Sequence, residues 1–208
     1  MNYTKIKEEA RNKIKGNIWK LILPSLIVFA IQLVVTLSTT DFTDLQNTSG
    51  DGISSLVTIA LYPIEFGIVV YYLDFVRGKD VQLKDIFGYY KQFGPIFLLF
   101  FLIGLFTTLW TLLFIIPGII AAIKYSMAPY IMADGETDAM TCINKSKVMM
   151  NGYKGDYFCF KLSFIGWFLL CLITFGIAYI YVFPYMKTAD AIYYEELKKI
   201  SQNKLTKR

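Results

Sequence analysis

The chain has 208 residues, of which 55% are hydrophobic and only 18% are charged, and its formal net charge is +5. Soluble domains usually carry about 25% charged residues, so this chain has too few charged groups to cover a water-facing surface. The positive charge is not gathered into a basic and aromatic patch, which argues against a nucleic-acid-binding protein. Histidine is absent, which excludes histidine metal ligands and every histidine-dependent catalytic triad.

Long segments without charge indicate helices that cross a membrane. Residues 21–40, 95–123 and 162–186 contain no Asp, Glu, Lys or Arg. A helix needs about 20 mostly apolar residues to cross a hydrocarbon core of about 30 Å. The sequence therefore predicts an all-α, multi-span transmembrane helix bundle that forms a single domain over residues 1–208. We interpret the first apolar segment as a retained span because it is longer than the apolar part of a signal peptide and lacks a small-residue cleavage site.

The predicted spans begin with residues 17–38, where Trp19 and Lys20 are placed as interfacial anchors, and continue with residues 53–76. The next apolar region, residues 95–133, is too long for one crossing. Pro117 and Gly118 lie near its middle, and such a pair favours a turn. We expect a tight hairpin there, with spans at residues 95–116 and 119–133.

The last apolar region is either one span with an interfacial tail or two spans, 157–175 and 177–195, that turn near Gly176. Lys and Arg collect in short cytoplasmic loops, and the 21 basic residues of the chain, with the single exception of Lys124, lie in residues 1–20, 77–94, 134–161 and 187–208. Six spans with both termini inside place all of these segments in the cytoplasm, whereas five spans would put the basic tail outside. We therefore expect six spans, arranged as three helical hairpins.

A weak internal repeat supports the hairpins. The segment APYIMAD, residues 128–134, resembles FPYMKTAD, residues 183–190. Each lies in the returning helix of a predicted hairpin, as does Pro63 in the second span. The alternative, that the three prolines fall in such positions by chance, stays open.

Three predicted cytoplasmic segments have amphipathic helical patterns. Thr4 is suited to cap a helix on which Ile6, Ala10 and Ile14 share one face. Residues 83–93 present Ile86, Tyr90 and Phe93 in this way, and residues 137–150 present Ala139, Ile143 and Met150. We expect these short interfacial helices to lie in the headgroup plane, held by apolar contact and by anionic lipid. The alternative is that they are solvated connectors.

Several short motifs, in order along nearly the whole chain, resemble a known family. They are AR (10–11) with KGNIW (15–19), FIIPGII (114–120), YSMAPYIMAD (125–134), KS (145–146) with MM (149–150) and Gly152, LSFIGW (162–167), and PY (184–185) with YYEEL (193–197). The chain resembles the bacterial domain-of-unknown-function 975 family of integral membrane proteins. The Pro-Gly-Ile turn followed by Lys124 is also similar to the membrane region of some glycerophosphodiester phosphodiesterases. The resemblance implies a bacterial inner-membrane protein of uncharacterised role, and without a catalytic domain the phosphodiesterase activity does not carry over.

Two ionisable residues, Glu65 and Lys124, lie inside predicted spans. Charged groups in a membrane are costly and indicate function by default. One hypothesis is that they pair, or that Glu65 binds a cation or proton beside Pro63, which leaves the carbonyl of Ile59 without its helical donor. The alternative is that Lys124 extends to the outer headgroups and Glu65 is a protonated packing residue.

Motifs for catalysis and cofactors are absent. The sequence has no HExxH, GxSxG or phosphate-binding loop, and its three cysteines form no CxxC pair that favours a metal site or a disulfide framework. We therefore predict no enzyme activity, cofactor or metal. A lipid-acting enzyme that uses Asp134, Asp138 or Asp190 is the least favoured alternative. Gly67, Gly104 and Gly166 are predicted positions of close helix contact.

The functional prediction is an accessory role in the bacterial cytoplasmic membrane, based on binding lipid or partner proteins. The expected partners are the lipid bilayer, its anionic headgroups, and a membrane protein or a second copy of the chain. The alternative is a small transporter or channel subunit that uses Glu65.

Overall fold

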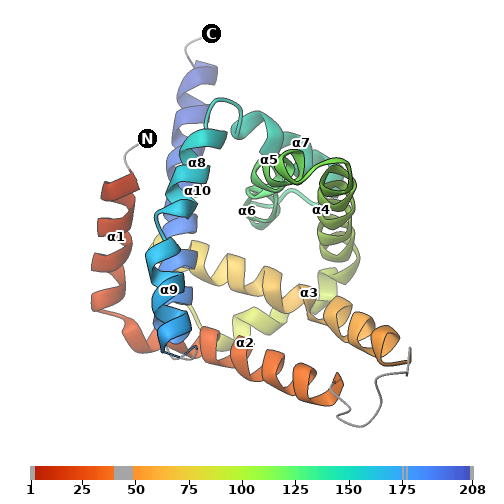
Figure 1. The fold of residues 1–208 in the computed structure, drawn as a ribbon. Coiled ribbons are helices and arrows are strands. Elements are labelled where there is room, and N and C mark those ends of the chain that lie inside the picture. The colour runs from red at the N-terminus through yellow and green to blue at the C-terminus, as the bar shows by residue number, and fades with distance from the viewer. Residues whose placement is uncertain (1–2, 40–48, 175, 177, 207–208) are drawn as a thin grey trace.

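The computed structural model describes residues 3–39, 49–174, 176 and 178–206, and in these ranges it contains helices and no strand. The elements, shown in Figure 1, are α1 (Tyr3–Lys15), α2 (Ile18–Thr39), α3 (Ser49–Val76), η1 (Leu83–Gln92), α4 (Phe93–Leu113), α5 (Ile115–Tyr125), α6 (Ala128–Ala133), α7 (Ala139–Met149), α8 (Lys154–Leu162), α9 (Ile165–Ile173) and α10 (Tyr179–Thr206). The predicted all-α class is confirmed.

Four helical segments among the described residues are long and apolar enough to cross a membrane. They are Ile59–Val76, Leu83–Leu113, Ile115–Ala133 and Lys154–Ile173, which correspond to the predicted spans 53–76, 95–116, 119–133 and 157–175. The predicted span 17–38 coincides with α2, in which Ile18–Ile27 is a shorter apolar segment. The predicted span 177–195 overlaps α10 from residue 179 onward, and α10 is not among the four. Residues 40–48, which make up most of the loop between the predicted spans 17–38 and 53–76, lie outside the described residues.

The turn between the third and fourth predicted spans is at Phe114, not at Pro117 and Gly118. Phe114 is extended, with φ −159° and ψ 147°, and separates α4 from α5. Pro117 and Gly118 instead lie in the first turn of α5, where a proline is tolerated because its missing N–H would have no helical partner. A Cβ atom on Gly118 would overlap Thr111 of α4, so this glycine allows the two helices to pack closely.

Further breaks divide the predicted fourth and fifth spans into shorter helices. α5 ends at Tyr125, and α6 begins at Ala128 with Pro129 in its first turn. Similarly, α8 ends at Leu162 and α9 begins at Ile165. The predicted turn near Gly176 is confirmed, because this glycine has a φ of 87° between α9 and α10, a conformation that glycine adopts without steric cost.

The N-terminal helix packs on protein, which corrects the expectation of a lipid-facing helix. Ile6, Ala10 and Ile14 do share one face of α1, but all three are buried, and α1 lies alongside α10 (Figure 1). The helix begins at Tyr3, so Thr4 lies within it. Its cationic side chains reach neighbouring helix ends: Lys7 Nζ donates to the Ser163 carbonyl at 3.1 Å.

Of the other two predicted amphipathic segments, one buries its apolar residues against protein and the other does so only in part. α7 buries Ala139 and Ile143, with Met150 directly after it. η1 is a 3₁₀ helix that packs on α3 and buries only Ile86, while Tyr90 and Phe93 are exposed.

One of the three predicted glycine contacts is confirmed. A Cβ atom on Gly67 of α3 would overlap the backbone carbonyl of Ile86 in η1, so only glycine fits there. Gly104 and Gly166 have no described neighbour within 4 Å of a Cβ position, so the described residues give no support to the expectation of close contact at these two glycines.

Candidate functional site

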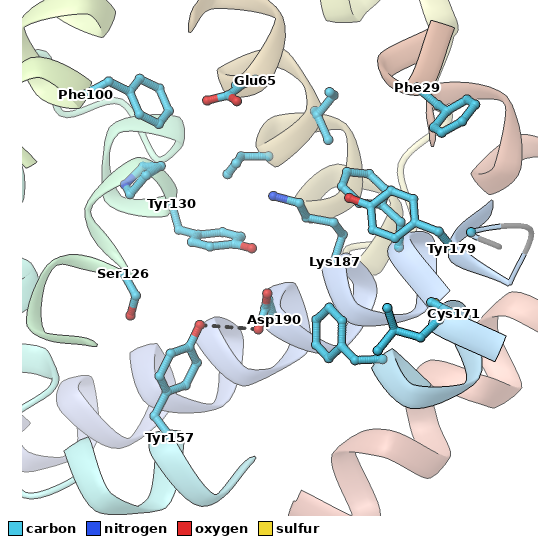
Figure 2. A pocket seen from close by; sticks show the side chains of 17 residues that line it. Phe29, Glu65, Phe100, Ser126, Tyr130, Tyr157, Cys171, Tyr179, Lys187 and Asp190 are labelled. Carbon is cyan, nitrogen blue, oxygen red and sulfur yellow. Dashed lines mark hydrogen bonds between the residues drawn. The ribbon is translucent and has the colours of Figure 1, made fainter. Parts of the chain in front are cut away.

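A large cavity, here called the central cavity, lies between the helix group α3, α4 and α6 and the helix group α8, α9 and α10 (Figure 2). Its volume is about 1310 Å³, above the roughly 300–1,000 Å³ of pockets for small molecules. The described residues that line it are mostly apolar or aromatic: Phe29, Ile68, Val69, Phe100, Pro129, Tyr130, Tyr157, Phe168, Cys171, Leu172, Gly176, Tyr179 and Phe183, together with Glu65, Ser126, Lys187 and Asp190.

The charged groups of the cavity come from two helices. Glu65 projects into it from α3, and Lys187 and Asp190 project from α10. Lys187 and Asp190 are three residues apart, a spacing that places both side chains on the same face of a helix. Figure 2 shows the Lys187 side chain directed into the space between the carboxylates of Glu65 and Asp190.

Asp190 has protein partners that satisfy its charge. Lys161 Nζ donates to Asp190 Oδ2 at 2.6 Å, and the Tyr157 hydroxyl donates to Asp190 Oδ1 at 3.3 Å. Asp190 is 8% exposed, and a buried carboxylate requires such partners because burial removes its hydration. Asp190 therefore links α8 to α10 at the wall of the cavity.

Glu65 and Lys187, in contrast, form no ion pair or hydrogen bond within the part of the chain that the structure describes. Lys187 is attracted electrostatically by Asp190 and, less strongly, by Glu65. The Lys187 ammonium lies 5.4 Å from the ring centroid of Phe183, a cation–π contact. The carboxylate of Glu65 is accessible from the cavity. Opposite charges of this kind, facing one cavity from different helices, are available to a ligand.

The residues singled out from the sequence are not brought together. Glu65 lines the central cavity, but Lys124 lies half-buried on α5 and is not among the described lining residues. The carbonyl of Lys124 accepts a hydrogen bond from Ser146 Oγ at 2.7 Å. No ion pair joins Glu65 to Lys124 in the described residues, so the structure gives no support to the hypothesis that they pair. Pro63 is buried within α3, which is continuous across it.

Sequence reasoning missed Lys187, because the positive-inside rule groups it with the basic residues of the cytoplasmic tail. Its position within the predicted span 177–195 was a signal, because an ionisable residue inside a span is costly. Its spacing of three residues from Asp190 was a second signal. The partners Tyr157 and Lys161 are distant in sequence and are identified only by the packing of α8 on α10.

A second charged cluster, here called the charge network, joins the ends of α3 and α6 to α10. Arg77 Nη2 lies 2.5 Å from Asp134 Oδ1 and 2.6 Å from Glu195 Oε1. Asp134 Oδ2 also accepts hydrogen bonds from the Tyr194 hydroxyl at 2.5 Å and from Lys198 Nζ at 2.6 Å. Arg77 follows α3, Asp134 follows α6, and the other members belong to α10.

The charge network lowers the pKa of Asp134. Burial disfavours the charged carboxylate and would raise this pKa, but the hydrogen bonds from Lys198, Tyr194 and Arg77 outweigh burial and hold it below its ordinary value. The network is therefore built around an ionised Asp134.

Comparison with protein families decides where this chain belongs. The model of the family described as protein of unknown function (DUF975) matches residues 1–124 and 112–201. The chain belongs to this family. The predicted resemblance is confirmed, whereas the likeness to the membrane region of glycerophosphodiester phosphodiesterases is not shown. No curated protein and no solved structure was found to match the chain.

Proposed function

We propose that this DUF975 protein is an integral membrane protein that binds an amphipathic lipid in its central cavity. The observation that carries the proposal is the composition of the cavity walls. They are apolar and aromatic over most of their extent, and Glu65, Lys187 and Asp190 are the charged residues among the described ones that line them. A lipid has the same division between apolar chains and a charged headgroup.

The exposed apolar side chains of α9 extend the apolar surface beside the cavity. Phe168 and Leu172 line the cavity and are 45% and 76% exposed. Contact between these exposed apolar side chains and water would be unfavourable. Contact with the acyl chains of a lipid would not be, because lipid chains are as apolar as the side chains. The polar part of the lipid would then lie near α3 and α10, where the charged groups are.

The proposed location is the bacterial cytoplasmic membrane, with both termini in the cytoplasm. The charge network supports this orientation, because it joins the ends of α3 and α6 to α10 at the positions where the predicted inward-running spans end. The start of α1 and the C-terminal end of α10 also lie on the same side of the molecule (Figure 1). We propose a binding role without catalysis.

A second candidate function is a small transporter or channel subunit. The observation that favours it is the accessible carboxylate of Glu65 in the cavity, close enough to Lys187 for electrostatic attraction. Proton or cation flux into proteoliposomes, compared between the wild type and Glu65→Gln, tests this function. Equal flux for both proteins, or no flux for either, would exclude it.

Lipid retention by the purified full-length chain tests the lipid-binding proposal. Native mass spectrometry after extensive detergent washing is expected to show one lipid retained per protein. Cys171→Trp places a large side chain in the cavity and is expected to abolish retention, since Cys171 is a lining residue. The matched control is Cys159→Trp, because Cys159 is exposed and does not line the cavity. Equal retention by both variants would show that the lipid binds elsewhere and would contradict the proposal.

A further inference from the structure

Glu65 and Lys187 are opposite charges that face the same cavity from α3 and α10 without an ion pair between them in the described residues. A charged side chain that faces a mostly apolar cavity without an ion pair or hydrogen bond is unfavourable, and it is retained where a ligand or another group compensates it. The two groups therefore indicate a ligand that carries both a positive and a negative charge.

We propose that the bound lipid has a zwitterionic headgroup, with its ammonium group at Glu65 and its phosphate at Lys187. This inference rests on the proposed function, because it names the headgroup of the lipid in the central cavity. A phosphate and an ammonium separated by a short linker satisfy both charges at once, each through charge-assisted hydrogen bonds.

A headgroup with only one sign of charge would leave either Glu65 or Lys187 without an oppositely charged partner. A purely anionic headgroup would pair with Lys187 but would place its negative charge near the carboxylate of Glu65. A purely cationic headgroup would pair with Glu65 and repel Lys187. Asp190 also attracts Lys187, but its carboxylate already pairs with Lys161 at 2.6 Å, which leaves the Lys187 ammonium able to contact a phosphate.

The Tyr130 hydroxyl adds a neutral donor beside these charges. Tyr130 comes from α6, and Figure 2 shows its hydroxyl directed into the cavity on the side of Lys187 and Asp190. No protein partner for this hydroxyl is found in the described part of the chain, so it is available to donate to a phosphate oxygen. The negative end of the headgroup therefore has two donors, Lys187 and Tyr130.

Competition between two lipids with the same acyl chains tests the inference. The purified full-length protein is equilibrated with equal amounts of phosphatidylethanolamine and phosphatidylglycerol in detergent, and the bound lipids are counted by native mass spectrometry. The wild type is expected to retain phosphatidylethanolamine in about tenfold excess, the ratio given by one charge-assisted contact. A wild type that retains phosphatidylglycerol equally or better would overturn the inference, whereas retention of neither lipid would contradict the proposed function itself.

Two variants make the test specific for charge. Glu65→Gln removes the ammonium partner and is expected to shift the retained lipid toward phosphatidylglycerol by about tenfold. Lys187→Gln removes the phosphate partner and is expected to lower retention of both lipids without a shift toward phosphatidylglycerol. A shift in the same direction for both variants would overturn the inference, since a purely structural defect acts without regard to the sign of the charge.

Matched controls exclude general effects of charge and folding. Lys124→Gln and Glu9→Gln remove one charge each outside the central cavity and are expected to keep the wild-type lipid ratio. Lys187→Arg keeps the cation and is also expected to keep that ratio, which separates charge recognition from a loss of folding in Lys187→Gln. A changed ratio in Lys187→Arg would count against the assignment of the phosphate to this position.

Discussion

Arg77 and Asp134 are 57 residues apart in the chain, yet a terminal nitrogen of the Arg77 guanidinium lies 2.5 Å from Asp134 Oδ1. The same guanidinium contacts Glu195 through its Nε and Nη2 atoms. One cation thus bridges two acids, Asp134 directly after α6 and Glu195 within α10. This geometry depends on the planar guanidinium of arginine, which a lysine ammonium cannot reproduce.

Arg77→Gln is expected to destabilise the protein by about 2–3 kcal/mol, because two partly buried acids lose a charged partner. The side chains of Arg77 and Asp134 are 23% and 17% exposed. Unfolding of the purified protein in detergent, followed by tryptophan fluorescence, measures the change. Lys79→Gln is the control: its ion pair with Asp74 is more exposed, at 59% for the lysine, and its loss should cost less than about 1 kcal/mol. Equal losses in both variants would contradict a special role for the network.

The lowered pKa of Asp134 predicts acid sensitivity. The ordinary pKa of an aspartate is 3.8, and the pKa of Asp134 in the folded protein is lower. Near pH 3.8 the folded protein therefore binds fewer protons at Asp134 than the unfolded chain does. The resulting stabilisation is present above the ordinary pKa and is lost as the pH falls through the lower pKa of the folded state. Asp134→Asn is therefore expected to unfold more readily than the wild type at pH 6, and the difference should shrink below about pH 4. A difference that is constant with pH would contradict this assignment.

Gly67→Ala is expected to destabilise the protein by about 1–3 kcal/mol, because the new methyl group would overlap the Ile86 carbonyl and force η1 away from α3. The control is Gly104→Ala on α4, where nothing described lies within 4 Å of the Cβ position. This substitution should be neutral or stabilising by up to about 1 kcal/mol, since alanine favours helix. Thermal unfolding in detergent compares the two. A larger loss at Gly104 would be inconsistent with the packing described here.

The burial of α1 on α10 predicts that its apolar face contributes to the stability of the whole protein. Ile6→Ala and Ile14→Ala should each cost about 2–4 kcal/mol, because both side chains are at most 1% exposed. Ile18→Ala is the control, since Ile18 is 38% exposed. If α1 instead detached to lie on lipid, neither buried isoleucine would matter for unfolding of the remaining helices, and hydrogen exchange in α1 would be rapid.

The proposed orientation predicts the behaviour of fused reporters. A reporter that is active only outside the cell should be inactive when attached after Arg208, and one that is active only in the cytoplasm should be active there. Activity of the outside reporter at the C-terminus would refute six spans with both ends inside. An insertion at Phe114, the turn between α4 and α5, should give the opposite result.

Helix positions were largely predictable from local sequence, and their boundaries were less so. Uncharged segments located α4, α5 and α9, and the periodic apolar residues of α1 and α7 identified their buried faces. The turn at Phe114 was misplaced because Pro117 is compatible with both a turn and the first turn of a helix. The choice between them depends on how closely α5 packs on α4 at Gly118 and Thr111.

The candidate site was only partly predictable for a different reason. Glu65 was identifiable as an acid inside an apolar segment, but Lys124 has the same local signature and is not among the described residues that line the cavity. Lys187 was grouped with the basic tail because the positive-inside rule considers charge along the chain and not the face of a helix. Local sequence does not specify which side of a helix meets a cavity, since that depends on the helices packed around it.

Composition and charge spacing by themselves predicted that this chain is all-helical and apolar, and short motifs along it carried the resemblance to the DUF975 family that the family model confirms. These properties follow from interactions within single helices and between a helix and its solvent. The tertiary structure alone decided that α1 packs on α10, that Arg77 meets Asp134, and that Glu65 shares a cavity with Lys187. Each of these contacts joins residues far apart in sequence, and their energies depend on packing that no local pattern encodes.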